Sequence, residues 1–441
     1  MKTALIFGSG RVARPAIRTL LERGHRVIVA TDQPEHATSM IDGHPHGEVA
    51  PLDAQDRESV RELVSRADGA ISLLPVHLHV RIAEACLSGR RHFVSTSYAS
   101  EEMRALDGLA RRRNLVFLNE IGADPGIDHM QAARAVHRIR ASGGRVRSLR
   151  SVCGGLPAPE AADNPFKYKV SWTPRGVVLA GARPARYLEN DRLVHVPRFG
   201  IFDHPSTITI EGLGQLESLP NGDALRYLDA YDLGEPHTIF RGTLRWPGWS
   251  ETWAALCRLG YLDDAPDASL PDSTWAREAW HAAGGRAEEN ARQATGRALG
   301  LPVDSAVLDR FDWLGLFRDE DLPQEARSRA DLLVERMEAS MRYGPNERDM
   351  LALHHEIEFE DASGQPYRYV SHLTEFGDPG GDSAMSKTVG IPAALALGRI
   401  LDGTIHIPGV RIPVSADVYG PVLADLGQVG IREVEVAEPL D

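Results

Sequence analysis

The chain has 441 residues, of which 42% are hydrophobic and 25% are charged, and its formal net charge is −13 at pH 7. This length exceeds what one ordinary hydrophobic core supports, so it predicts two or three domains. The sequence is acidic and contains no cluster of lysine and arginine residues. Nucleic acids and anionic membrane surfaces bind such clusters, so neither is expected as a partner.

The three cysteines, Cys86, Cys153 and Cys257, are odd in number and far apart in the sequence. This spacing disfavours a disulfide framework and predicts a reducing, cytoplasmic location. The opening MKTALIFGSG runs directly into a strand and a glycine turn, so we expect no signal peptide. No apolar run reaches the roughly 20 residues that a membrane-spanning helix needs, so we expect no membrane partner.

Residues 1–127 alternate short apolar runs with amphipathic segments. The predicted strands are TALIF (3–7), RVIVA (26–30), EVAPL (48–52), GAISLL (69–74), HFVST (92–96) and LVFLN (115–119). Strands that alternate with helices form right-handed crossovers and a parallel sheet. Because the runs are continuously apolar, helices should cover both faces of the sheet. The pattern therefore predicts an α/β fold with a doubly wound parallel sheet.

The pattern of hydrophobic and polar residues changes after these predicted strands. Residues 146–245 are rich in Gly, Pro, Thr and aromatic residues, which is typical of a more open, antiparallel sheet. Residues 251–342 have helical spacing, and LALHHEIEFED and YRYVSHLTEFGD return to strand character. MSKTVGIPAALALGRILDG predicts a long apolar helix that ends at Gly403. The predicted domains are a dinucleotide-binding domain (1–127, completed by about 384–425), an inserted α+β domain (128–250 and 343–383) and a helical subdomain (251–342).

The first strand leads into the G-x-G-x-x-A form of the dinucleotide fingerprint. Gly8 permits a tight turn, Gly10 has no Cβ to block a pyrophosphate, and Ala13 lets the next helix pack closely. The helix N-terminus supplies N–H groups for an anion. The residues expected to touch the cofactor here are Gly8, Ser9, Gly10, Arg11, Val12 and Ala13. The context predicts a Rossmann domain that binds a nucleotide; the alternative is a purely structural turn.

The second strand ends at Thr31-Asp32-Gln33. Asp32 lies at the distance from the glycines at which an acidic residue hydrogen-bonds the ribose 2′-OH of NAD. A carboxylate there would repel the 2′-phosphate of NADP, and no arginine adjoins it, so the sequence favours NAD. The alternative is that Asp32 caps the next segment. Asp53, at the end of the third strand, is a second cofactor candidate.

The last strand of this domain continues into the acidic stretch at residues 115–130, LVFLNEIGADPGIDHM. Ligands bind beyond the carboxyl ends of strands in open α/β sheets, so Glu120 to His129 should lie at the ligand edge. Asp124 precedes Pro-Gly and is expected on a rigid turn, where we predict a functional role. Asp128 begins a helix, and we expect it to act as a cap.

Motifs along nearly the whole chain occur in the order FGSGRVARP, DGAISLLP, STSY, NEIGADPGIDH, SVCGGLPAPEAADNP, YKVSW, RGTLRW, WLGLF, NERDM, AMSKTVG and ILDGTI. Together they resemble the saccharopine dehydrogenase family of the L-glutamate-forming type, also called saccharopine reductase. The resemblance implies a Rossmann domain, an inserted α+β substrate/dimerisation domain and a helical subdomain. It also implies an NAD(P)-dependent homodimeric enzyme of lysine metabolism. Such enzymes interconvert saccharopine with L-glutamate and 2-aminoadipate 6-semialdehyde through an imine.

The resemblance also implies site residues. An imine needs an acid or base near the carbon that exchanges the hydride, and the family motifs point to Asp124 and Tyr98, with Cys153 close by. Tyr98 as a packing aromatic and Cys153 as an inert buried thiol are the alternatives. Further cofactor candidates from these motifs are Leu73, Leu74, Thr96 and Ser97.

A substrate with three carboxylates needs cations, and the arginine fork suits a carboxylate. The resemblance places substrate binding at Tyr98 and Asp124, and at the segment Thr243, Leu244 and Arg245. Arg175 and Lys169 are further candidates, with a solvated surface charge as the alternative for each.

Two departures from the family pattern bear on specificity. Asp32 stands where NADPH-using members carry a basic residue, so NAD is favoured and NADP stays possible from the family. Gly222, in LPNGD, stands where the family motif PNRD has an arginine that contacts a substrate carboxylate. The alternatives are therefore a related enzyme for a carboxylated polyamine or opine-like amine, or a non-catalytic nucleotide-sensing protein.

Histidine pairs occur at His44/His46, His77/His79 and His354/His355, without cysteine or acidic ligands at metal-site spacing. We therefore expect no metal. The last pair lies in an alternating strand whose polar positions could face solvent. Lys387, on the long apolar helix, is a cofactor candidate or a surface lysine.

Overall fold

The computed structural model describes residues 1–268, 270 and 273–440. The chain forms two compact units. The first comprises residues 1–147, 227–235 and 355 onward, and the second comprises residues 148–226 and 236–354.

The first unit is built on a seven-stranded sheet in the order β15-β6-β5-β4-β1-β2-β3. Its strands are β1 (Thr3–Phe7), β2 (Arg26–Thr31), β3 (Gly47–Pro51), β4 (Gly69–Ser72), β5 (His92–Ser95), β6 (Val116–Leu118) and β15 (Gly409–Arg411). All pairs are parallel. The six predicted strands and the parallel sheet are confirmed.

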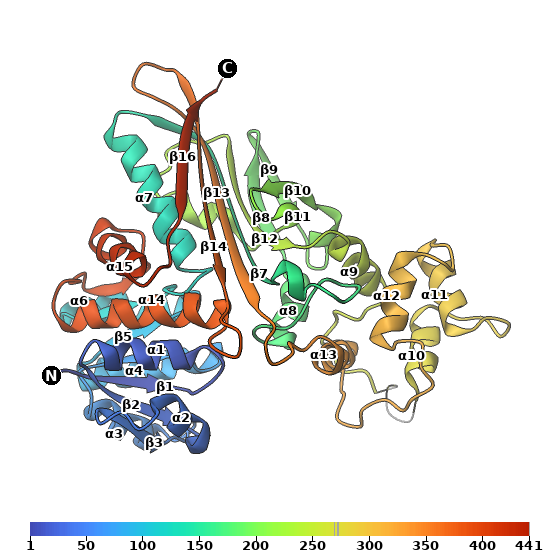
Figure 1. Cartoon of the computed structure of the whole chain (residues 1–441), viewed down its shortest axis with the longest axis horizontal. Coiled ribbons are helices and arrows are strands. Elements are labelled where there is room, and N and C mark those ends of the chain that lie inside the picture. Colours follow the sequence, from blue (N-terminus) through green and yellow to red (C-terminus); the bar gives the residue numbers. More distant parts are fainter. Residues whose placement is uncertain (269, 271–272, 441) are drawn as a thin grey trace. The chain divides into compact units, whose positions relative to one another are not determined.

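Helices cover both faces of this sheet (Figure 1). The helices of the first unit are α1 (Ala13–Glu22), α2 (Pro34–Ile41), α3 (Arg57–Ser65), α4 (His79–Gly89), α5 (Glu101–Ala105), α6 (Asp107–Arg112), α7 (Ile127–Ala141), α14 (Ala384–Leu401) and α15 (Ala416–Gln428), and α7 and α15 pack against each other. Leu5, Ile28 and Phe93 point to one face, where they pack with side chains of α3 and α4. On the other side α1 packs against α14, which also contacts β4 and β5. The predicted long apolar helix is α14.

Two further strands of the first unit, β14 (Pro366–Phe376) and β16 (Val434–Pro439), pair antiparallel. The boundary between the units falls within β13 (Asp349–Glu360). One expectation for this strand is wrong, because His354 and His355 are buried rather than facing solvent.

The sheet of the second unit runs in the order β10-β11-β12-β7, and β8 pairs with both β12 and β9. The strands are β7 (Arg145–Pro157), β8 (Ala185–Glu189), β9 (Arg192–Val196), β10 (Ser206–Ile210), β11 (Gly214–Pro220) and β12 (Thr238–Arg245). The predicted antiparallel sheet is wrong for one pair, since β12 runs parallel to β7. A long connection separates these two strands in the sequence, which is what a parallel pair requires.

Helices follow β12 as predicted. They are α9 (Trp249–Arg258), α10 (Trp275–Ala282), α11 (Ala291–Leu299), α12 (Ala306–Leu314) and α13 (Arg329–Ser340), and α8 (Pro174–Gly181) precedes them. Trp253, Trp275 and Phe311 are among the largest fully buried side chains of their shared core. Whether residues 251–342 form a separate domain stays a prediction. Within the described part of the chain, no helix is long and apolar enough to cross a membrane.

We predict that Gly390→Ala destabilises the protein. A Cβ on Gly390, in α14, would lie 2.5 Å from the Val12 carbonyl oxygen and 3.1 Å from the Ala16 nitrogen. Forcing α1 and α14 apart should cost about 1–3 kcal/mol of unfolding free energy, measured by chemical denaturation. Gly420→Ala is the matched control, because Gly420 lies in α15 and a Cβ added there would have no atom within 4 Å. That variant should be neutral or gain about 0.4–1 kcal/mol. Equal stability of the two variants would contradict the prediction.

Candidate functional site

The glycine loop of the first unit has the geometry that a pyrophosphate needs. Gly8 has a φ of +99°, and its N–H donates to the Ala30 carbonyl at 2.8 Å. The Ser9 hydroxyl bonds the Thr31 hydroxyl at 2.7 Å, which fixes the loop to the end of β2. A Cβ on the exposed Gly10 would meet no atom within 4 Å. The space beside Gly10 and the N-terminus of α1 therefore fit a bound phosphate.

The other predicted cofactor residues of this unit lie beyond β4 and β5. A Cβ on Gly8 would lie 3.3 Å from both the Leu73 carbonyl oxygen and the Leu74 Cδ2, so both leucines adjoin the loop. The Ser97 hydroxyl bonds His79 Nε2 at 3.0 Å. Thr96 precedes it and is half-buried.

His79 stood out in the sequence only as half of a histidine pair. Its Nδ1 bonds the Ser72 hydroxyl at 2.8 Å, so the ring bridges the last residue of β4 and the segment that follows β5. Burial, and secondly the charge of His77, lowers the pKa of His79 to about 4. The ring is therefore neutral at physiological pH and serves as a hydrogen-bonding spacer.

Asp32 lies one residue beyond β2 and is exposed. The capping alternative is wrong, because the N-cap of α2 is Gln33. Among the residues that the structure describes, Asp32 makes no side-chain hydrogen bond or ion pair. Its carboxylate is therefore available to a ligand. Asp53 is also exposed, and its Oδ1 accepts the Gln55 N–H at 2.8 Å.

The structure brings together two residues predicted to be catalytic. The Tyr98 hydroxyl donates to Asp124 Oδ1 at 3.0 Å, and both residues are half-buried. Tyr98 follows β5 and Asp124 follows β6, so both lie at the carboxyl edge of the parallel sheet. Gly126, with φ +149°, closes the turn, and a Cβ there would overlap the Gly122 oxygen. The turn thus requires glycine at this position.

Asp128 is not the N-cap of α7, as its position had suggested; Gly126 is. Asp128 lies in the first helical turn, where its Oδ1 accepts the Gly126 N–H at 2.6 Å. The carboxylate therefore stabilises the helix start from inside the helix. This contact also holds the turn that carries Asp124.

A buried polar cluster behind this turn was not predicted from the sequence. It consists of Glu120, His129, Tyr227 and Tyr231. Glu120 and His129 stood in the acidic stretch already singled out, but the two tyrosines are far away in the sequence. A positive φ of 58° at the non-glycine Glu120 is a structural signal that no sequence pattern reveals.

The second unit contains a buried arginine at one of the predicted substrate positions. The Arg245 guanidinium lies 5.2 Å from the ring centroids of both Tyr168 and Trp249. Its Nη1 donates to the Leu244 carbonyl at 2.8 Å, whereas its buried Nε has no partner in the described chain. Burial lowers the pKa of Arg245, opposed by the charges of Tyr168 and Cys153. No carboxylate of a described residue pairs with it.

Three other predicted residues surround Arg245 in the sheet. Cys153 on β7 is the register partner of Thr243 on β12, and it is buried and takes part in no disulfide. Side chains alternate along a strand, so Thr243 and Arg245 share one face. Leu244 points to the other face and is fully buried.

The other candidate cations already have carboxylate partners within the second unit. Arg175, near the start of α8, pairs with Asp331. Lys169 is buried and pairs with Asp163 at 2.8 Å and with Glu347 at 2.6 Å. Because protein carboxylates already neutralise Arg175 and Lys169, these side chains attract a substrate carboxylate less strongly than Arg245 does.

Gly222 follows β11 and has a φ of +65°, and no atom of the described residues would lie within 4 Å of an added Cβ. Its carbonyl accepts the Arg186 N–H at 2.9 Å. The Arg186 guanidinium also forms two hydrogen bonds with Asp223, at 3.1 and 2.7 Å. The position where the family pattern has an arginine is thus open space here.

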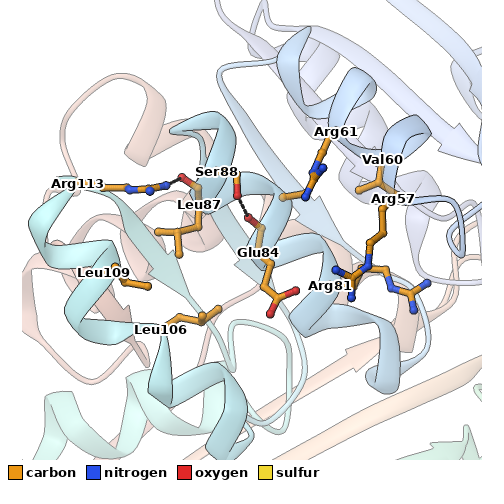
Figure 2. Close-up of a pocket in the computed structure, with 11 residues that line it drawn as sticks. Arg57, Val60, Arg61, Arg81, Glu84, Leu87, Ser88, Leu106, Leu109 and Arg113 are labelled. Carbon is orange, nitrogen blue, oxygen red and sulfur yellow. Dashed lines mark hydrogen bonds between the residues drawn. The ribbon is translucent and has the colours of Figure 1, made fainter.

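The described residues contain no group of three side chains suited to hold a metal ion. Lys387 pairs with Glu375 at 2.5 Å and with Asp378 at 3.2 Å. Residues of α3, α4 and α6 line a pocket of about 310 Å³. Figure 2 shows Arg57, Arg61 and Arg81 across from Arg113 in this pocket. None of the predicted site residues lines this pocket, which is therefore not part of the candidate site.

Two family models match the chain. Residues 4–118 match the saccharopine dehydrogenase NADP binding domain, and residues 122–431 match the saccharopine dehydrogenase C-terminal domain. The chain is 33% identical to saccharopine dehydrogenase (NADP+, L-glutamate-forming) of Schizosaccharomyces pombe, over 98% of each protein. It is also 33% identical to mitochondrial alpha-aminoadipic semialdehyde synthase of Bos taurus, over 98% of this chain but 47% of that longer protein.

Among solved structures, the chain is similar to apo saccharopine dehydrogenase (L-glutamate-forming) from Saccharomyces cerevisiae. The TM-score is 0.89 at 31% sequence identity, covering 99% of this chain and 100% of that one. The fold class expected from the sequence is confirmed. Two family models, a fungal relative matched over nearly its full length and a solved structure agree, so the chain belongs to the saccharopine dehydrogenase family.

Proposed function

We propose that this protein is a pyridine-nucleotide-dependent oxidoreductase that interconverts saccharopine with L-glutamate and 2-aminoadipate 6-semialdehyde. The observation that carries the proposal is the Tyr98–Asp124 hydrogen bond at the carboxyl edge of a sheet with a nucleotide-binding loop. The names of the relatives, which specify saccharopine dehydrogenase, support the choice of substrate.

In the oxidative direction, the secondary amine of saccharopine loses a proton from nitrogen and a hydride from the adjacent carbon, and a C=N bond forms. The nicotinamide, when bound, supplies the hydride acceptor. Asp124 is placed to accept the amine proton and to return it to the C=N nitrogen, which activates the C=N carbon toward water. Again a carboxylate, Asp124 then takes a proton from the water that adds to this carbon and passes it to the nitrogen. The C–N bond then breaks, releasing L-glutamate and the semialdehyde. The Tyr98 hydroxyl orients the Asp124 carboxylate through their hydrogen bond.

Arg245 is our candidate for binding a substrate carboxylate. It is a buried cation that no carboxylate of the described residues pairs with, and burying an unpaired charge is costly unless a ligand supplies the counter-charge. Cys153 and Thr243 are further candidates on the same two strands. The amino-acid substrate, the homodimer and the cytoplasmic location remain predictions.

A second candidate function is favoured by Gly222. A saccharopine carboxylate held by an arginine at this position in the family pattern would meet open space here. A substrate that lacks this carboxylate, such as a carboxylated polyamine or another opine-like secondary amine, fits the same chemistry.

The substrate test is reduced-nicotinamide production by the purified protein with saccharopine and with a panel of secondary amines that lack one carboxylate. We expect the highest kcat/KM with saccharopine. A panel member that exceeds saccharopine at least tenfold would replace it as the substrate and assign the difference to Gly222. If the protein binds nucleotide but turns over none of these compounds, the nucleotide-sensing alternative is favoured.

We propose that Asp32 gives a preference for NAD, although the relatives are named for NADP+. A carboxylate about 5 Å from the 2′-phosphate would repel it by roughly 3 kcal/mol per unit charge at an effective dielectric constant of about 20. Asp32→Ala should therefore lower the NAD-to-NADP ratio of kcat/KM by about 10- to 100-fold. Glu62→Ala, an exposed acidic position on α3, is the matched control and should leave the ratio unchanged. An unchanged ratio in Asp32→Ala would remove Asp32 from cofactor selection.

Replacing Arg245 should affect the substrate and not the nucleotide. Losing one partner of a buried charge pair with a substrate carboxylate costs about 2–5 kcal/mol. We therefore expect Arg245→Met to lower kcat/KM for saccharopine at least 30-fold while the nucleotide Kd stays within twofold. Arg258→Met, at an exposed position on α9, controls for loss of positive charge. A loss confined to nucleotide binding would contradict the assignment.

A further inference from the structure

Glu120 lies directly beyond the β6 segment, is fully buried, and adopts a φ of +58°. We propose that Glu120 is a positioning residue: its carboxylate and backbone hold Tyr98 and Asp124 in the geometry that proton transfer requires. The inference rests on the proposed function, since it assigns to Glu120 a role in the same reaction.

Glu120 holds the chain on both sides of Tyr98. Its backbone N–H donates to the Ser97 carbonyl at 3.1 Å. Its Oε1 accepts the Ala99 N–H, also at 3.1 Å. Because these two bonds flank Tyr98, they fix the backbone from which the phenol projects toward Asp124.

The other carboxylate oxygen of Glu120 connects to the helix behind Asp124. Glu120 Oε2 bonds His129 Nε2 at 3.0 Å, and His129 lies in the first turn of α7. That turn is joined to the Asp124 loop, because the Ile127 N–H donates to the Gly122 carbonyl at 2.9 Å. One carboxylate therefore links the Tyr98 segment to the element that carries Asp124.

Two tyrosines complete this arrangement. The Tyr227 hydroxyl donates to Glu120 Oε2 at 3.1 Å, and the Tyr231 hydroxyl bonds His129 Nδ1. The two phenol rings stack at 5.4 Å, and the Tyr227 ring lies 4.7 Å from the His129 ring. Glu120 and His129 are fully buried beside these rings, so neither side chain is exposed to bulk solvent.

The charge state of Glu120 suits a fixed acceptor. Burial by itself would raise its pKa, but the hydrogen bond and charge of His129, the Ala99 N–H and the charge of Arg104 together lower it. Arg104 Nη2 lies 3.6 Å from Glu120 Oε1. The carboxylate is thus ionised, surrounded by donors and shielded from solvent, so it orients its neighbours and does not exchange protons with a substrate.

A buried carboxylate at positive φ costs both desolvation free energy and backbone strain, and well-packed apolar residues often stabilise a fold equally well. The carboxylate fixes the relative orientation of three separate chain segments, because its two oxygens bond to Ala99, His129 and Tyr227 at once. A positioning role accounts for both the strain and the burial.

The test uses Glu120→Gln in the wild-type protein and in a Tyr98→Phe background. Glutamine has one acceptor oxygen in place of two and cannot accept from Ala99, His129 and Tyr227 together. We expect kcat with saccharopine to fall about 10- to 100-fold in the wild-type background, with the nucleotide Kd and the KM for nucleotide within twofold. Because part of the effect of Glu120 passes through Tyr98 and part through the Asp124 loop, the loss should be at least threefold smaller in Tyr98→Phe than in the wild-type background. Equal losses in both backgrounds, or a parallel loss of nucleotide binding, would overturn the proposal.

Two further variants keep the test decisive. Tyr227→Phe removes one donor to Glu120 but keeps the ring stack, and it should lower kcat severalfold with the same pattern. Glu101→Gln, at an exposed position on α5, is the matched charge control and should leave kcat unchanged.

Hydrogen exchange separates this proposal from the proposed function. In Glu120→Gln, the peptide that carries Ala99 should exchange faster than in wild type or in Glu101→Gln, while the glycine-loop peptide is unchanged. Absence of saccharopine turnover in the wild-type protein would defeat the proposed function alone. Unchanged exchange at Ala99 would defeat the role of Glu120, whatever the substrate.

Discussion

Parallel pairing of β1 with β2 and with β4 is the constraint on which the chemistry of the first unit depends. Parallel strands end at the same edge of a sheet, so the segments that follow them meet there. The Ser9–Thr31 hydrogen bond joins the first two of these segments, and His79 joins the last residue of β4 to the segment after β5. Hydrogen bonds between neighbouring loops thus fix the positions of the side chains that gather at the carboxyl edge of the sheet.

The two units handle buried charge in different ways. In the first, Glu120 is satisfied by donors from the protein itself. In the second, Lys169 is paired by Asp163 and Glu347, whereas Arg245 lies against aromatic rings and has no carboxylate partner among the described residues. Aromatic faces stabilise a guanidinium without neutralising it. The contrast distinguishes a charge that serves the fold from one that is left for a ligand.

Much of the first unit could be predicted from the sequence because its signals are local. Continuous apolar runs identified the strands, the glycine spacing identified the turn, and Asp124 stood out beside Pro-Gly. β15 was missed because three residues are too few for a period, and its partner β6 lies almost 300 residues earlier. The same distance hid Tyr227 and Tyr231, which only the fold brings to Glu120 and His129. Hydrophobic periodicity also could not show that His354 and His355 are buried.

The segmented composition of the first unit has a consequence for how the chain acquires its structure during synthesis. β6 leaves the ribosome as an edge strand, and its neighbour β15 follows only near the end of the chain. α1 likewise waits for α14 before its apolar face is covered. Through most of translation, the nascent chain therefore displays an unpaired strand edge and an open hydrophobic face, the features that invite chaperone binding and aggregation. The nucleotide-binding fold is therefore completed late in synthesis, and the nascent chain is prone to aggregation until α14 and β15 have been made.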